Sequence, residues 1–184
     1  VNSTPTAEAL VFRRDLTWQS MSWSQADHRV RQLANALLAN GVEPEQRCVL
    51  LADTSAEWIL SDVAILCSGA ATTTIYPSST ADECAYILND CEATAVFCDS
   101  QQQVDKLLGI RDRLPLLRFV VTFDGRATAD GWVRELSDFA TLGESWAKEH
   151  PNRFQETIDA ILPEAITTSL SPSGTTRVPH SRMP

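Results

Sequence analysis

The chain has 184 residues, of which 43% are hydrophobic and 21% charged, and its formal net charge at pH 7 is −9. The negative charge excludes nucleic acid as the main partner, because binding to phosphates relies on clustered lysine and arginine. No apolar run approaches the roughly 20 residues that span a bilayer, which argues against an integral membrane segment. The composition is typical of a soluble globular protein. Because the first residues lack the character of a signal peptide, a cytoplasmic location is expected.

The five cysteines, at positions 48, 67, 84, 91 and 98, do not indicate a metal or redox site. None of them forms the Cys-x-x-Cys spacing that zinc and redox sites use. Cys48 and Cys98 lie in apolar, strand-like runs, and Cys67 lies in a helical one. We therefore predict reduced, mostly buried thiols that pack as small hydrophobic side chains, and no metal site.

Capped helices and apolar strands alternate from residue 24 to residue 124. The first helix is expected to begin at Ser24, in a capping-box pattern, and to end at Gly41. Strands are expected at 48–52, 72–76, 95–98 and 119–123. The helices between them are expected to begin at Thr54, Thr80 and Ser100. Strands that are apolar throughout are typical of a parallel sheet covered on both faces. The alternation predicts a doubly wound, flavodoxin-like α/β fold with helices on both faces of the sheet.

The pattern weakens after Asp124. A helix is expected within residues 131–150, where Pro151 ends it, and a shorter one within residues 154–162. Residues 167–184 are rich in Ser, Thr, Pro and Arg, which predicts a loop.

Residues 171–176, with the sequence Ser-Pro-Ser-Gly-Thr-Thr, form the segment best suited to chemistry. Small hydroxyl residues around a glycine let backbone N–H groups approach a polyphosphate, and the hydroxyls add further donors. Such a run is also typical of a plain flexible loop, so its composition alone leaves both interpretations open. Tyr76 is a candidate for lining a ligand cleft, because it ends a predicted strand and ligands bind beyond the carboxyl ends of parallel strands.

Other side chains that often serve in sites have simpler interpretations here. His28 is expected on the polar side of the first helix, in contact with water. His150 precedes Pro151 at a helix end, where a positive charge complements the helix dipole. Packing in the core or at its edge is expected for the five tryptophans, Trp18, Trp23, Trp58, Trp132 and Trp146.

Five segments together resemble one enzyme family. They are residues 22–24 (Ser-Trp-Ser), 41–44 (Gly-Val-Glu-Pro), 53–58 (Asp-Thr-Ser-Ala-Glu-Trp), 75–80 (Ile-Tyr-Pro-Ser-Ser-Thr) and 86–93 (Tyr-Ile-Leu-Asn-Asp-Cys-Glu-Ala). On these residues the chain resembles the N-terminal part of AMP-binding, adenylate-forming acyl-CoA synthetases. The last two segments are more similar to long-chain fatty-acid–CoA ligases than to the adenylation domains of peptide synthetases.

The resemblance implies a phosphate loop at Ser173, Gly174, Thr175 and Thr176, which would bind the β- and γ-phosphates of ATP. A carboxylic (fatty) acid would attack the α-phosphorus to give an acyl-adenylate and pyrophosphate, and CoA would then form the thioester and release AMP. Mg²⁺ would bridge the phosphates. The catalytic residues are expected downstream of this chain, and peripheral membrane contact of the full-length form stays open. Residues 1–165 would form the N-terminal α/β subdomain, and residues 166–184 a degenerate phosphate-loop segment with an irregular tail.

The residues after Thr176 depart from the family pattern. Where the family continues with Gly-x-Pro-Lys-Gly, residues 177–181 are Arg-Val-Pro-His-Ser. The missing lysine predicts that the chain alone is inactive, and we hypothesise a frameshift near codon 176. Two alternatives remain: a non-catalytic α/β interaction module or pseudoenzyme, and an adenylation domain for an amino or aryl acid. Residues 86–93 favour the fatty-acid ligase over the second alternative.

Overall fold

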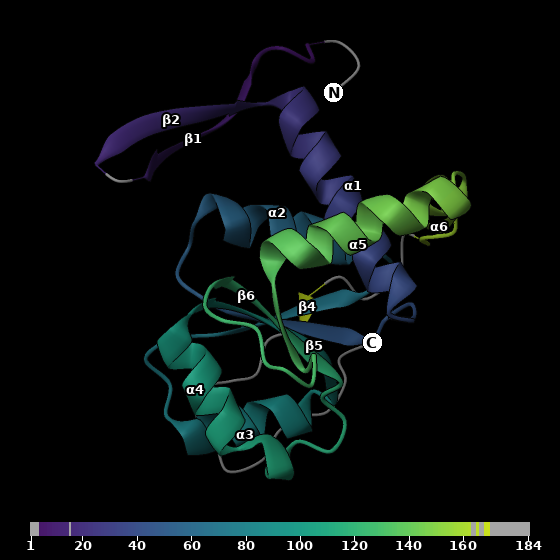
Figure 1. Ribbon diagram of the computed structural model, residues 1–184. Coiled ribbons are helices and arrows are strands. Elements are labelled where there is room, and N and C mark those ends of the chain that lie inside the picture. Colours follow the sequence, from purple (N-terminus) through teal and green to yellow (C-terminus); the bar gives the residue numbers. More distant parts are fainter. Residues whose placement is uncertain (1–3, 15, 163–164, 166–167, 170–184) are drawn as a thin grey trace.

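A six-stranded parallel sheet forms the centre of the molecule (Figure 1). The computed structural model describes residues 4–14, 16–162, 165 and 168–169. The strands of the sheet are β3 (Arg47–Leu51), β4 (Ala71–Ile75), β5 (Ala93–Ser100), β6 (Phe119–Asp124), β7 (Val133–Glu135) and β8 (Thr168–Ser169). Their order is β7-β6-β5-β3-β4-β8. Counted from β3, the first five strands follow the order 2-1-3-4-5 of flavodoxin-like folds, which confirms the predicted fold class.

Helices cover both faces of this sheet (Figure 1). One face carries α1 (Trp23–Ala39), α2 (Ala56–Cys67), α5 (Leu136–Glu149) and α6 (Arg153–Asp159), and the other carries α3 (Ala81–Asp90), α4 (Gln101–Gly109) and the short 3-10 helix η1 (Arg111–Arg113). On the first face α1 packs against both α2 and α5, so it lies between them. No helix in the described ranges is long and apolar enough to cross a bilayer.

Alternate residues of each central strand enter two separate cores. In β3, Cys48 and Leu50 belong to the cluster under α1, α2 and α5, and Val49 and Leu51 belong to the cluster under α3 and α4. All four side chains are fully buried. A strand buried on both faces needs apolar residues at every position, which explains the continuous apolar run in the sequence.

The helix starts show which capping predictions were right. The Thr80 cap of α3 is confirmed, since its hydroxyl accepts from the Glu83 N–H while the Glu83 side chain accepts from the Thr80 N–H. For α1 the predicted cap Ser24 is wrong, because Ser22 holds the extended backbone conformation and forms the capping box with Gln25. In α2 the cap is Ser55, one residue after the predicted start.

An antiparallel hairpin precedes the α/β body and was not predicted. Its strands, β1 (Glu8–Arg14) and β2 (Thr17–Ser22), project from the start of α1 (Figure 1). Trp18 on this hairpin is 71% exposed and Trp23 is 44% exposed, so neither is buried in the core. Trp58 does pack against the core, and Trp132 is buried within it.

The segment predicted as one helix over residues 131–150 contains a strand and then a helix. Val133–Glu135 forms β7, which pairs in parallel with β6, and α5 begins directly afterwards. The three-residue strand has no sequence pattern of its own, because pairing with β6 is what fixes it.

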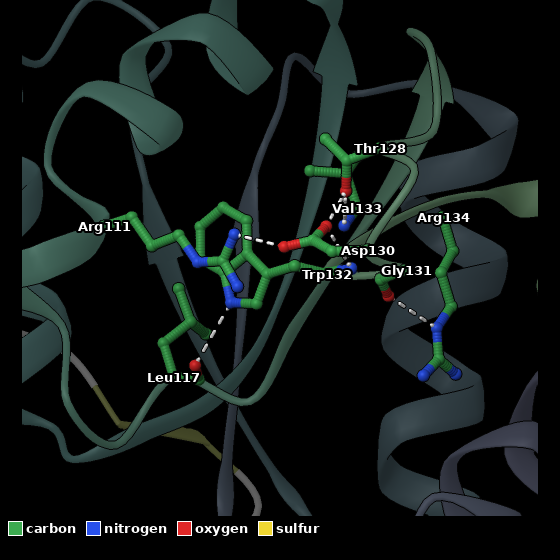
Figure 2. Close-up of polar contacts among 8 residues, drawn as sticks. All are labelled: Arg111, Leu117, Thr128, Asp130, Gly131, Trp132, Val133 and Arg134. Carbon is green, nitrogen blue, oxygen red and sulfur yellow. Dashed lines mark hydrogen bonds and ion pairs between the residues drawn. The ribbon is translucent and has the colours of Figure 1, made fainter.

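A polar cluster holds the turn that leads into β7 (Figure 2). Asp130 accepts hydrogen bonds from the Thr128 hydroxyl at 2.6 Å and from the Trp132 N–H at 3.1 Å, and it pairs with Arg111 at 2.5 Å. The guanidinium of Arg111 also lies over the Trp132 ring, 4.5 Å from its centroid. The Thr128 hydroxyl bond comes first among the causes that hold the pKa of Asp130 well below its usual range, followed by the Arg111 bond.

All five cysteines are free thiols, and Cys48, Cys84 and Cys98 are buried, as predicted. Burial raises the pKa of Cys48 and of Cys98 to about 12. A thiol with so high a pKa stays protonated near neutral pH, and only the thiolate is a good nucleophile. These two cysteines therefore act as core side chains.

Candidate functional site at the carboxyl edge of the sheet

The four predicted phosphate-binding residues, Ser173, Gly174, Thr175 and Thr176, lie outside the described residues. The described strand nearest to them in sequence is β8, which belongs to the segment expected to be a loop. Thr168 pairs with Thr72 and Ser169 with Thr73, in parallel with β4. Strand β8 therefore directs the chain toward the carboxyl edge of the sheet, on the side of β4.

The loop after β4 is held firmly at that same edge. A turn closes it, with the Ser79 N–H donating to the Tyr76 carbonyl at 2.9 Å. From α4, the Lys106 ammonium donates to the Pro77 carbonyl at 2.9 Å and to the Ser79 carbonyl at 2.7 Å. The Gln103 amide also donates to the Pro77 carbonyl, at 3.1 Å. Three side-chain hydrogen bonds from one helix thus fix the course of this loop.

Tyr76 stands where this loop leaves β4, and its side chain is 81% exposed. The expectation that it would lie at a strand end is confirmed, and a ligand contact stays a prediction. Lys106 and Gln103 were missed because they make contacts 26 to 29 residues away along the chain. Gln103 is buried beside Val104 on the packed side of α4, and a polar residue at an apolar-face position is the feature that could have revealed it.

The start of α3 adds a second fixed point at this edge. The Thr80 N–H donates to the Glu83 carboxylate at 2.7 Å. This backbone hydrogen bond is the largest cause that lowers the pKa of Glu83, followed by the Thr80 hydroxyl and opposed by desolvation. Glu83 is consequently a charged cap whose oxygen is already engaged, and it is not a free general base.

The switch point of the sheet lies between β3 and β5. The chain runs from β3 to β4 on one side, and then crosses to β5 on the other side of β3. There the Asp53 N–H donates to the Asp99 carboxylate at 2.9 Å. Crevices at such switch points are the usual ligand sites of open α/β sheets. Helices α2, α3 and α4 all begin at this carboxyl edge, and helix N-termini attract anions.

The N-termini of three helices thus lie at this part of the edge. The described residues contain no group of three or more His, Cys, Asp or Glu side chains that could hold a metal.

A separate pocket of about 610 Å³ lies at the opposite, amino edge of the sheet. Its lining includes Val42 and Pro44 ahead of β3, Gly69 ahead of β4, and Trp146 and Arg153 from α5 and α6. The residues that precede parallel strands cannot reach the carboxyl edge, where the phosphate loop is expected. This pocket is therefore distinct from the candidate site.

Comparison with known proteins places the chain in a family. The model of the family described as AMP-binding enzyme matches residues 1–179, and the chain belongs to this family. The human long-chain-fatty-acid–CoA ligase ACSBG1 is 32% identical over 180 residues, which is 95% of this chain and 24% of that protein. The Xenopus laevis ligase ACSBG2 is 28% identical over 181 residues, covering 95% of this chain and 23% of that protein.

Among solved structures, the anthranilate CoA ligase AuaEII in complex with anthranoyl-AMP superposes with a TM-score of 0.66 and 29% identity. The match covers 75% of this chain and 25% of that one. The chain thus spans about a quarter of the length of these relatives.

Proposed function

We propose that this chain is the N-terminal part of an ATP-dependent fatty-acyl-CoA ligase. In the complete enzyme a fatty acid carboxylate would attack the α-phosphorus of ATP, giving an acyl-adenylate and pyrophosphate. The thiol of CoA would then displace AMP and form the thioester. The observation that carries this proposal is the similarity to a long-chain ligase over 95% of the chain, together with a family match that extends past the predicted phosphate loop.

In this proposal the chain supplies residues that bind the phosphates of ATP. Ser173, Gly174, Thr175 and Thr176 would offer backbone N–H groups and hydroxyls to the β- and γ-phosphates. The direction of β8 and the helix N-termini at the carboxyl edge support this role. Mg²⁺ would neutralise phosphate charge and position the reacting groups. The chain alone is expected to be inactive, because Arg177 and His180 stand where the family has glycine and lysine.

One alternative substrate has a specific observation in its favour. The solved relative that binds anthranoyl-AMP is an aryl-acid ligase, and its identity to this chain, 29%, is close to that of the long-chain ligases. A second alternative, a non-catalytic module or pseudoenzyme, is favoured by the lysine-free sequence of residues 177–181.

The test is a chimera in which this chain replaces the matched region of the human ligase ACSBG1. The exchange of labelled pyrophosphate into ATP is measured with hexadecanoate and with anthranilate. We expect weak exchange from the chimera and a gain of about 100-fold from the triple variant Arg177→Gly, His180→Lys, Ser181→Gly, because each well-placed phosphate donor contributes strongly to such transfers. Thr175→Ala in the restored chimera should remove most of that gain.

Each outcome decides between the candidates. Exchange that depends on hexadecanoate and on Thr175 supports the proposal. Exchange with anthranilate alone favours the aryl-acid ligase. A folded, restored chimera without exchange would mean that the chain is a non-catalytic module.

A further inference from the structure

Helix α2 is apolar on both of its sides. Of its twelve residues, two are charged, Glu57 and Asp62. The inner side packs Leu60, Ala64 and Ile65 into the core. The other side carries Ile59, Val63 and Leu66, whose spacing of four and three residues forms one stripe along the helix. A helix that is hydrophobic all round is normally buried all round.

Among the described helices, α1 and α6 contact α2, and only part of the stripe is covered. Ile59 and Leu66 are half-buried, whereas Val63 is exposed. Because α1 packs against both α2 and α5, α2 lies on the outer side of α1 in this layer. It connects β3 to β4, so it lies on the side of the sheet where β4 and β8 form the edge. The side of α2 opposite its core residues therefore faces away from α1. Val63, in the middle of the stripe, is 40% exposed.

The adjacent strand is incompletely covered as well. Thr72 pairs with Cys48 in parallel register and Thr74 pairs with Leu50, so both threonines point to the α2 side of the sheet. Thr72 is buried, whereas Thr74, two residues further on, is exposed. Among the described residues, β8 pairs with Thr72 and Thr73 and leaves the carboxyl half of β4 without a neighbour on that side.

Helix α5, at the other end of the same layer, gives a contrast. Its outward positions include Thr141, Glu144 and Lys148, which are polar and exposed, and Leu142 is a single apolar residue among them. Such a surface is suited to water. The α2 stripe lacks this polar character apart from Asp62, so it is suited to an apolar protein surface.

We propose that Ile59, Val63, Leu66 and Thr74 form a docking face for the part of a full-length ligase that this chain does not contain. About three quarters of the length of its relatives lies outside the matched region, which is ample to cover the face. Among the described residues the face is continuous with the carboxyl half of β4, so the same partner surface would cover both. This inference rests on membership of the family and is independent of which acid is activated.

The test compares Val63→Lys in the chain alone and in the chimera with the human ligase ACSBG1. In the chimera the lysine would be buried without a partner, and we expect the thermal midpoint to fall by about 4 °C or more. In the chain alone the lysine reaches water, and the midpoint should stay within about 1 °C, as for an ordinary surface substitution. The matched control is Leu142→Lys on α5, since Leu142 is also 40% exposed; it should leave both proteins unchanged.

Two results would overturn the inference. Equal falls in the chain and in the chimera would mean that Val63 supports its own domain only, and no fall in the chimera would mean that the face stays in water. Light scattering adds a third: a dimer of the isolated chain that Val63→Lys dissociates, with no effect in the chimera, would assign the face to a second copy.

If the chimera is insoluble, the same variants are tested by co-expression. The chain carries an affinity tag, and the human ligase lacking its matched region is the untagged partner. Co-purification that Val63→Lys abolishes and Leu142→Lys preserves supports the docking face, and no co-purification with the unmodified chain contradicts it. Both readouts measure association and not catalysis, so they fail independently of the proposed reaction.

Discussion

A Cβ atom placed on Gly143 of α5 would stand 1.9 Å from the carbonyl oxygen of Gln32 in α1. The same atom would lie 2.7 Å from the Ala36 nitrogen. Both neighbours are helix backbone, which cannot move aside as a flexible side chain can. The two helices therefore approach each other this closely only because residue 143 has no side chain.

The substitution Gly143→Ala should lower the free energy of unfolding by about 3 kcal/mol, because overpacking against backbone forces the helices apart. Urea denaturation measures the change. Gly109→Ala, at the end of α4, is the control, since nothing lies within 4 Å of a Cβ at that position. It should be neutral or slightly stabilising, and equal losses in the two variants would contradict the steric explanation.

Replacing Lys106 by methionine should loosen the loop after β4. The variant keeps the apolar stem and removes the donor to two backbone carbonyls, so we expect a loss of about 1–2 kcal/mol in stability. Hydrogen exchange at the Ser79 amide should become faster, because the turn that protects it loses its anchor. Lys148→Met is the matched control, as Lys148 is the other lysine of the chain and is exposed. Unchanged exchange at Ser79 would show that Gln103 and the turn suffice.

The depressed pKa of Asp130 predicts a contribution to stability that depends on pH. A carboxyl whose pKa is lower in the folded state stabilises the fold above its unfolded value of about 3.9, and this contribution is lost as the pH falls below that value. Asp130→Asn should therefore destabilise the protein at pH 7, and the difference from the unmodified chain should shrink below about pH 4. Denaturation at several pH values tests this. Thr128→Ser keeps the hydroxyl donor and should retain the pH dependence, whereas a constant Asp130→Asn effect down to pH 2 would contradict it.

Two helix caps that look alike in sequence should respond differently to alanine. The Thr80 hydroxyl accepts from the Glu83 N–H, so Thr80→Ala should cost about 1 kcal/mol. Ser100 occupies the same position before α4 but makes no capping hydrogen bond with its side chain. Ser100→Ala should therefore be close to neutral in thermal unfolding. A larger loss at Ser100 than at Thr80 would show that the hydroxyl bonds do not set these costs.

Local patterns predicted the helices and central strands well. The Thr80 capping box and the continuous apolar run of β3 depend on neighbours within a few residues, and both were predictable. The hairpin was missed because its turn has no glycine. Leu16 adopts a φ of 64°, a backbone conformation that is usually occupied by Gly or Asn and is then recognisable from the sequence. Strand β7 and the role of Gly143 depend on partners far along the chain, and no local pattern contains that information.

The candidate site also has a part that the sequence predicts and a part that depends on tertiary contacts. The hydroxyl-rich segment at residues 173–176 is recognisable from composition and family resemblance, and it lies outside the described residues. The anchoring of the neighbouring loop by Lys106 was not predictable, since it needs α4 to lie beside a loop that is 27 to 29 residues earlier in the chain.

The hydrogen bonds from Lys106 to the Pro77 and Ser79 carbonyls also have a practical consequence for attaching the protein to surfaces. With the Lys106 ammonium bound to two carbonyls, amine-directed coupling at lysine side chains should favour Lys148. Lys148 lies near the end of α5, which begins at the carboxyl edge and runs back for roughly 20 Å toward the amino edge. Molecules immobilised through that lysine would share one orientation, with the carboxyl edge of the sheet turned to the solution.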